Sequence, residues 1–177
     1  MEQELKRNYI YKGRIINLRE DRVLLPNGKE SLRGVVEHPG AVAVVAITTE
    51  KEIVLVRQYR KAVGEDLLEI PAGIPHPGEK GDDCARRELE EETGFHAKKI
   101  RKLCAGFASP GYSNELIQFY LAEQMAKMAQ KTDEDEFIEV ELVDMELAYD
   151  MAKRGKINDN KTMIGIFLAD LILKGEI

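Results

Sequence analysis

Two apolar runs that follow each other closely limit the folds open to this chain most strongly. Residues 41–50 read AVAVVAITTE and residues 52–60 read EIVLVRQYR, with a short charged link between them. A strand with one face in water alternates apolar and polar residues, whereas a strand covered on both faces is apolar almost throughout. The two runs therefore predict buried strands at the core of a sheet.

The other segments suggest strands early in the chain and helices late in it. A Pro-Asn-Gly turn at 26–28 predicts a hairpin within residues 9–38. Further strands are expected at 66–73, 98–109, 115–124 and 137–143, and a mobile polar loop is expected at 124–136. This order predicts an α/β (α+β) fold, an α/β/α sandwich around a mixed β-sheet with an N-terminal antiparallel β segment.

Helices are expected in three places. Asp82 or Asp83 is positioned to cap a helix that runs to Thr93, where Gly94 can take the left-handed conformation that often ends a helix. Two more helices are predicted over 145–155 and 161–175, each closed by a glycine.

Length and charge narrow the class of protein. A chain of 177 residues suits one ordinary domain. We divide it into an N-terminal β segment, residues 1–40, and a main domain, residues 41–177. No stretch is apolar enough to span a membrane, and the first residues lack the apolar core of a secretory signal, so we expect a cytoplasmic protein that binds no membrane. A formal charge of −6 argues against nucleic acid as a partner.

Residues 73–95, GIPHPGEKGDDCARRELEEETGF, place four acidic side chains within positions 88–92. On a helix, Glu88, Glu91 and Glu92 share one face, while Leu89 points to a neighbouring side that can pack on the sheet. A solvated charged face is the ordinary interpretation of such a cluster. Like charges one turn apart repel, however, and we expect Arg86 and Arg87 to point elsewhere, so a divalent cation is the predicted compensation.

A hard cation such as Mg²⁺ takes one or two carboxylates together with phosphate oxygens. The loop before the helix is rich in glycine and proline, which lets backbone groups come close, so Ala72 is expected to add a carbonyl oxygen to the metal. The pattern therefore predicts phosphate chemistry at this helix.

The same stretch resembles the Nudix box at every fixed position of that motif. The matching residues are Gly73, Glu79, Arg87, Glu88, Leu89, Glu91, Glu92, Gly94 and Phe95. The resemblance implies a Nudix hydrolase domain over 41–177, with Mg²⁺, or else Mn²⁺ or Zn²⁺, as cofactor. It implies that Glu88 and Glu92 bind the metal, that Glu91 is a further or water-mediated ligand, and that Glu79 pairs with Arg87.

Features outside the box resemble the ADP-ribose pyrophosphatase branch of this family. Pro110 lies fifteen residues beyond the box, and VVEHPGAVAVVA, VLVRQYR and LLEIPAG extend the similarity to roughly residues 8–173. In that branch an arginine matching Arg60 clamps a phosphate, and Arg33 would come from a partner subunit; either could instead be a surface charge. Tyr112 is a candidate to stack on a base or ribose. Gly34 replaces an acidic residue common in the branch, which leaves adenine contact to the backbone.

The resemblance also implies a mechanism and an assembly. A catalytic glutamate is expected just before the strand at 137–143, with Glu136 as the first match and Glu134 as the second, and the substrate is a small nucleotide sugar. The expected reaction is metal-dependent hydrolysis of ADP-ribose to AMP and ribose 5-phosphate in a homodimer formed through residues 1–40. Alternatives are another ADP-sugar, a GDP-sugar, a dinucleoside polyphosphate or an oxidised nucleotide as substrate, or a ligand sensor without turnover.

Overall fold

The computed structural model describes residues 1–130 and 137–177. It forms two compact units. The first comprises residues 1–40 and 106–117, and the second comprises residues 41–105 and 118–177. Among the described residues, no helix is long and apolar enough to cross a membrane.

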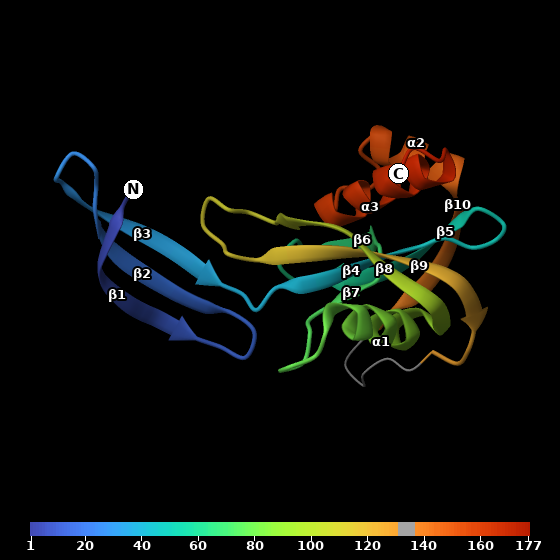
Figure 1. Cartoon of the computed structure of the whole chain (residues 1–177), viewed down its shortest axis with the longest axis horizontal. Helices are drawn as coiled ribbons and strands as arrows, with labels where there is room; N and C mark the ends of the chain where they lie inside the picture. The colour runs from blue at the N-terminus through green and yellow to red at the C-terminus, as the bar shows by residue number, and fades with distance from the viewer. Residues whose placement is uncertain (131–136) are drawn as a thin grey trace. The chain divides into compact units, whose positions relative to one another are not determined.

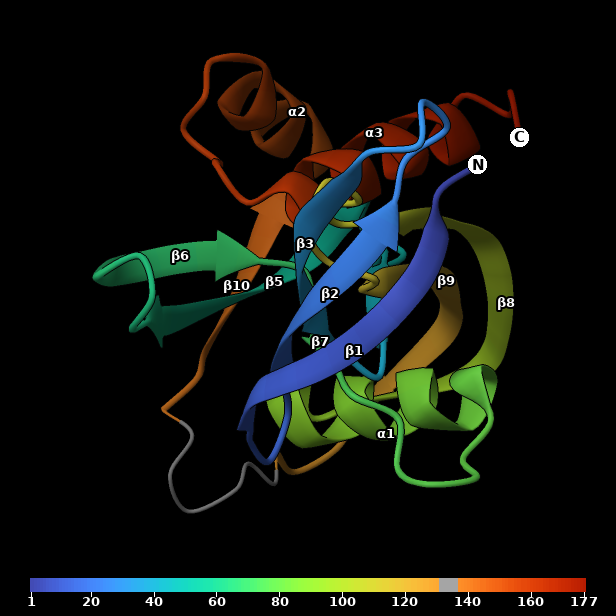
Figure 2. The ribbon, with the colours of Figure 1, turned by 90° about the vertical axis from the view of Figure 1, so that its left-hand side faces the viewer.

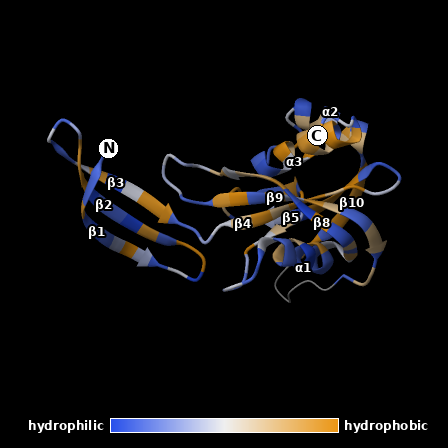
Figure 3. Ribbon diagram, in the orientation of Figure 1, coloured by the Kyte–Doolittle hydropathy of each residue, from blue (hydrophilic) through white to orange (hydrophobic). Residues whose placement is uncertain are grey.

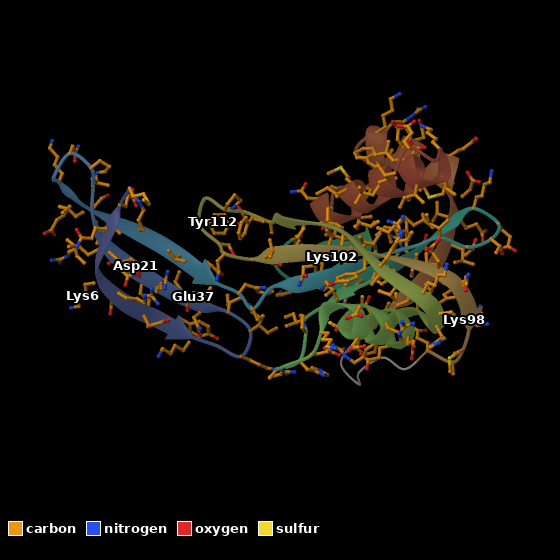
Figure 4. The ribbon with its side chains drawn as sticks, in the orientation of Figure 1. Lys6, Asp21, Glu37, Lys98, Lys102 and Tyr112 are labelled. Carbon is orange, nitrogen blue, oxygen red and sulfur yellow. The ribbon has the colours of Figure 1, made fainter. Side chains whose placement is uncertain are left out.

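The first unit is built on three antiparallel strands, β1 (Gln3–Lys12), β2 (Asn17–Leu24) and β3 (Glu30–Glu37), in the order β1-β2-β3. The predicted hairpin turn is confirmed: the Leu25 N–H donates to the Lys29 carbonyl, and Gly28 adopts a φ of 79°, which costs a glycine little. Figure 3 shows apolar and polar residues mixed along these strands. The polar residues Asp21 and Glu37 lie on β2 and β3 in Figure 4.

The second unit holds two sheets (Figure 1). One contains β7 (Ala72–Gly73), β4 (Ala41–Ala46), β9 (Leu116–Lys127) and β8 (Phe95–Phe107) in that order. The other contains β10 (Glu139–Asp144), β5 (Glu52–Arg60) and β6 (Glu65–Glu69) in that order. The two apolar runs are thus both strands, as predicted. They belong to different sheets, which an isolated bridge between Ile47 and Ile53 connects.

Helices cover the strands of the second unit from two sides. Helix α1 (Gly81–Thr93) and helix α3 (Asn160–Leu173) both contact β4, and α2 (Met145–Lys153) packs on α3. Figures 1 and 2 show α1 on one side of the strands and α2 with α3 on the other. The predicted α/β/α sandwich is therefore confirmed. Val42, Val44 and Val45 of β4 are fully buried, and each such side chain stabilises the fold by about 1.5–3 kcal/mol.

Several local predictions were wrong for identifiable reasons. The strand expected over 66–73 is two strands, because it breaks at Pro71, which has no N–H to donate. Helix α1 begins after Lys80, whose side chain makes no capping hydrogen bond, and Asp82 and Asp83 lie in the first turn instead. The loop expected from residue 124 begins later, because β9 continues to Lys127; residues 131–136 of that loop lie outside the described part.

Candidate active site

A bidentate ion pair joins the loop between β7 and α1 to the helix. Arg87 donates from Nε to Glu79 Oε1 and from Nη2 to Glu79 Oε2, at 2.9 Å in both cases. Glu79 Oε2 also accepts the His76 N–H at 2.8 Å, and Arg87 Nη2 reaches the Ile74 carbonyl at 3.3 Å. The hydrogen bonds from Arg87 lower the pKa of Glu79 to about 2. The carboxylate therefore stays ionised and keeps the loop closed on the helix.

Arg87 also lies among the other carboxylates of the helix. Its Nη1 donates to Glu88 Oε1 at 2.8 Å and to Glu91 Oε2 at 2.9 Å. The expectation that Arg87 points elsewhere was wrong, because its long side chain reaches the loop and both glutamates at once. Hydrogen bonds to Glu79 first, and then the charge of Glu88, raise the pKa of Arg87. One arginine thus offsets part of the charge of three glutamates.

The side chains of Glu88 and Glu92 both reach the short strand β7. Glu92 Oε2 accepts the Ala72 N–H at 3.1 Å. A Cβ built on Gly73 would overlap the carboxyl group of Glu88, so that carboxyl lies directly against the Gly73 backbone. Both glutamates are largely buried, with side-chain exposure of 12% for Glu88 and residue exposure of 5% for Glu92. Gly73 is required here because only glycine leaves room for a carboxylate at this distance.

Glu91 differs from these two glutamates, because its side chain is 43% exposed and bonds to Arg87. The structure thus brings Glu88 and Glu92 to Ala72 and Gly73, and leaves Glu91 at the rim. Within residues 1–130 and 137–177, no group of three or more His, Cys, Asp or Glu side chains is arranged to hold a metal ion. Glu91 shares the Arg87 Nη1 donor with Glu88, so it lies beside the pair at β7.

Two carboxylates still fit a hard divalent cation. Mg²⁺ in phosphate-handling sites commonly takes only one or two protein carboxylates, and water and substrate oxygens complete its shell. Glu88, Glu92 and the carbonyl oxygen of Ala72 are all hard oxygen donors, which Mg²⁺ prefers over nitrogen or sulfur. The donor set at β7 is consistent with such an ion.

The C-terminal end of α1 contacts residues 128–130, which follow β9. Gly94 closes the helix with a φ of 69°, and a Cβ there would lie 2.8 Å from the Met128 carbonyl oxygen. Gln130 Nε2 donates to the Glu92 carbonyl at 2.7 Å, so residues 128–130 are held against the end of the helix. Glu136 and Glu134, the two candidates for a catalytic base, lie outside the described residues.

A cavity of about 360 Å³ opens beside the outer flank of the same helix. Its lining is mainly charged and combines α1 with the segment after β9: Asp83, Arg86, Arg87, Glu90, Glu91, Met128 and Ala129. Arg87 and Glu91 belong both to this cavity and to the carboxylate cluster. The cavity therefore adjoins the carboxylate cluster at these two side chains.

Arg60, a predicted phosphate ligand, is held by a buried carboxylate that the sequence did not single out. Its Nε and Nη2 donate to the two carboxylate oxygens of Glu69 at 2.6 and 2.7 Å. The ammonium of Lys161 bonds to the same carboxylate. The signal for Glu69 was present, since it is the one acidic residue inside the run LLEIP.

The other predicted ligands lie in the first unit. Arg33 donates from Nε to Glu2 at 3.2 Å and from Nη1 to Ser31 at 2.9 Å, and Gly34 is its neighbour on β3. Pro110 and Tyr112 lie in the turn between β8 and β9, and Figure 4 shows Tyr112 there. The Tyr112 carbonyl accepts the Val36 N–H at 2.7 Å, while 59% of the residue is exposed. Tyr112 is therefore an exposed residue of this turn.

Comparison with known proteins identifies the domain families of the chain. The NUDIX domain family matches residues 37–164, and the nucleoside diphosphate sugar hydrolase N-terminal domain matches residues 2–36. An ADP-ribose pyrophosphatase of Bacillus subtilis (strain 168) is 46% identical over 141 residues, which cover 78% of this chain and 76% of that protein. A methanol dehydrogenase activator of Bacillus methanolicus is 45% identical with the same coverage.

A solved structure described as an ADP compounds hydrolase has the same fold. Its TM-score is 0.87 at 22% sequence identity, and the match covers 99% of this chain and 95% of that one. The NUDIX match spans most of the chain and contains the helix that carries Glu88 and Glu92. The chain belongs to the Nudix hydrolase family.

Proposed function

We propose that this protein hydrolyses the pyrophosphate of ADP-ribose to AMP and ribose 5-phosphate in a Mg²⁺-dependent reaction. The observation that carries the proposal is the placement of the Glu88 and Glu92 carboxylates against Ala72 and Gly73. The 46% identity with a relative named ADP-ribose pyrophosphatase supports the choice of substrate. The match of the nucleoside diphosphate sugar hydrolase N-terminal domain to residues 2–36 supports a nucleotide sugar.

Different residues of the chain would bind the metal ion and the substrate phosphate. Glu88, Glu92 and the Ala72 carbonyl would hold Mg²⁺, with Glu91 contributing at the rim. Bound Mg²⁺ supplies Lewis-acid polarisation of the phosphoryl oxygens and lowers the pKa of water. Arg60 donates hydrogen bonds to a substrate phosphate, because guanidinium and phosphate oxygens match in geometry.

Positioning residues and a base complete this proposal. Glu79 and Arg87 keep the loop and the helix together, so that the carboxylates of the helix stay aimed at β7. Glu136 orients or deprotonates the attacking water; Glu134 is the alternative. Water attacks one phosphorus, the P–O bond of the pyrophosphate breaks, and the two monophosphates leave.

The proposal extends to assembly and location. The protein acts as a homodimer formed through residues 1–40, in which Arg33 reaches the partner's substrate and Pro110 and Tyr112 contact the adenosine half. Exposed apolar side chains on the first three strands, among them Ile10, Tyr11 and Leu32, favour a covered surface there. Two free cysteines, Cys84 and Cys104, agree with a reducing cytoplasm.

A substrate panel tests the choice of nucleotide. ADP-ribose, ADP-glucose, GDP-mannose, diadenosine polyphosphates and 8-oxo-dGTP are each incubated with the enzyme, with Mg²⁺ and with a chelator in its place. The proposal predicts that ADP-ribose has the highest kcat/KM and that the chelator abolishes turnover. Preference for another member would keep the chemistry and replace the substrate, while no turnover on any of them would favour a ligand sensor.

A further inference from the structure

Behind Arg60 lies a group of charged side chains that the proposed chemistry does not use. Glu69 is almost fully buried, with 1% of its side chain exposed, and it accepts hydrogen bonds from Arg60 and Lys161. Lys161 Nζ also donates to Asp159 at 3.0 Å. Lys161 is largely buried as well, so two cations and two anions form one cluster between β5, β6 and the start of α3.

Glu69 depends on both cations to remain ionised at this depth. Burial alone would raise its pKa, but the hydrogen bond from Arg60 and the charge and hydrogen bond of Lys161 bring the pKa below its ordinary value. A buried carboxylate that loses a compensating cation either takes up a proton or shifts toward its remaining partner. Replacing Lys161 with an uncharged residue would therefore change the hydrogen bonds between Glu69 and Arg60.

The two hydrogen bonds from Arg60 to Glu69 restrict the orientation of the guanidinium group. Nε and Nη2 are both occupied by Glu69, and Nη1 makes no hydrogen bond within the described part of the chain. The fork therefore fixes the guanidinium plane and leaves Nη1 as the nitrogen that can donate to a ligand. The hydrogen bond to Glu69 chiefly raises the pKa of Arg60, and the charge of Glu92 adds to the shift, so Arg60 lies within electrostatic reach of a carboxylate at β7.

Attachment of α3 to the strands does not depend on Lys161 alone, because Thr162 makes a separate contact. The Thr162 hydroxyl, which is fully buried, accepts the Ile70 N–H at 2.9 Å and ties the helix to the strand end. Asp159 caps the helix by accepting the Thr162 N–H at 2.9 Å. The contact between Thr162 and Ile70 does not involve the Lys161 ammonium, whereas the capping oxygen of Asp159 also accepts a hydrogen bond from Lys161.

We propose that Lys161 and Glu69 are positioning residues that hold Arg60 in the orientation that binds a substrate phosphate. This inference rests on the proposed hydrolysis of a nucleotide sugar. Lys161 itself does not touch the substrate in this account. Its charge keeps Glu69 ionised and fixed, and the Glu69 fork holds the guanidinium of Arg60 in one plane with Nη1 left to donate, so that binding a phosphate does not require ordering a long side chain.

The test compares Lys161→Met, Lys161→Arg and a matched control, Lys174→Met. Lys174 lies at the other end of α3 and pairs with Asp170 at 2.7 Å on the surface. For Lys161→Met we expect KM for ADP-ribose to rise about fivefold, the cost of ordering one long side chain on binding, with kcat little changed. Lys161→Arg should restore most of the wild-type KM, and Lys174→Met should leave it unchanged.

A double-mutant cycle shows whether Lys161 acts through Arg60. In an Arg60→Ala background, Lys161→Met should raise KM no further, because the group it positions is gone. Equal effects of Lys161→Met in the two backgrounds would overturn the inference. So would a wild-type KM in Lys161→Met, or an increase in KM of the same size in Lys174→Met.

An NMR measurement keeps the inference testable if ADP-ribose is not the substrate. The Nε–H signal of Arg60 should be sharp and slow to exchange in the wild type and in Lys174→Met, and broadened in Lys161→Met. Sharp signals without any turnover of ADP-ribose by the wild type would reject the proposed function and retain the positioning. An unchanged Arg60 signal in Lys161→Met would reject the positioning.

Discussion

Replacing Gly73 with alanine should separate activity from stability at the candidate metal site. The backbone of Gly73 does not adopt the left-handed conformation, so alanine at this position causes no backbone strain. The new methyl group would overlap the carboxyl group of Glu88. Because carbon atoms in contact stay about 3.5–4.0 Å apart, the carboxylate must move by more than about 1 Å.

The two consequences of this displacement differ in size. Misplacing a catalytic group by about 1 Å costs about a hundredfold in rate, so kcat for ADP-ribose should fall by at least that factor. The folded state loses the hydrogen bond between Arg87 and Glu88, worth about 1–2 kcal/mol in this partly buried place. Alanine also lowers the conformational entropy of the unfolded chain, which stabilises the folded state by about 0.4–1 kcal/mol. The free energy of unfolding should therefore change by no more than about 1–2 kcal/mol.

Steady-state kinetics with Mg²⁺ and urea unfolding measure the two effects on one preparation. Gly106→Ala is the matched control, because a Cβ at Gly106 meets no atom within 4 Å among the residues described. We expect the control to keep wild-type kcat and stability. A Gly73→Ala enzyme with wild-type kcat would refute the placement of Glu88, and a Gly73→Ala chain that fails to fold would refute the claim that only the carboxylate has to move.

Three further predictions concern the helix that carries the site. Arg87→Met should lower the free energy of unfolding by about 2 kcal/mol in urea, because it leaves carboxylates of a partly buried cluster without their cation; an unchanged midpoint would contradict this. Because the folded pKa of Glu79 is lowered from 4.5 to about 2, its contribution to stability is present above pH 4.5 and is lost as pH falls toward 2; Glu79→Gln should flatten that part of the stability curve. Gly94→Ala should destabilise the fold by about 1–2 kcal/mol, because alanine is strained at a φ of 69°; thermal unfolding at the wild-type temperature would count against this.

The sequence predicted the elements that depend on local patterns. Helix α1, its closure at Gly94 and the buried strands β4 and β5 follow from periodicity and from a residue suited to a left-handed conformation. The α/β/α layers followed from the order of strands and helices along the chain. These features are encoded within a few residues of one another.

Features that depend on contacts between distant segments could not be read in this way. Neither apolar run carries a signal that would assign β4 and β5 to different sheets. Helix periodicity gives only the direction of a side chain, so it did not show that Arg87 also bonds to Glu88 and Glu91 while it pairs with Glu79. The pairing of Glu69 with Lys161 joins residues 92 positions apart, so no local pattern contains it.

Phosphorus NMR of ADP-ribose incubated with the enzyme and Mg²⁺ tests the central claim most directly. The wild type is compared with Glu92→Gln, which keeps the shape of a buried side chain at β7, and with Glu90→Gln, a control on the same helix whose carboxylate pairs with His96. We predict AMP and ribose 5-phosphate from the wild type and from Glu90→Gln, and a rate at least about a thousandfold lower from Glu92→Gln. Near-wild-type turnover by Glu92→Gln, or equal turnover by the wild type without a divalent cation, would contradict the account.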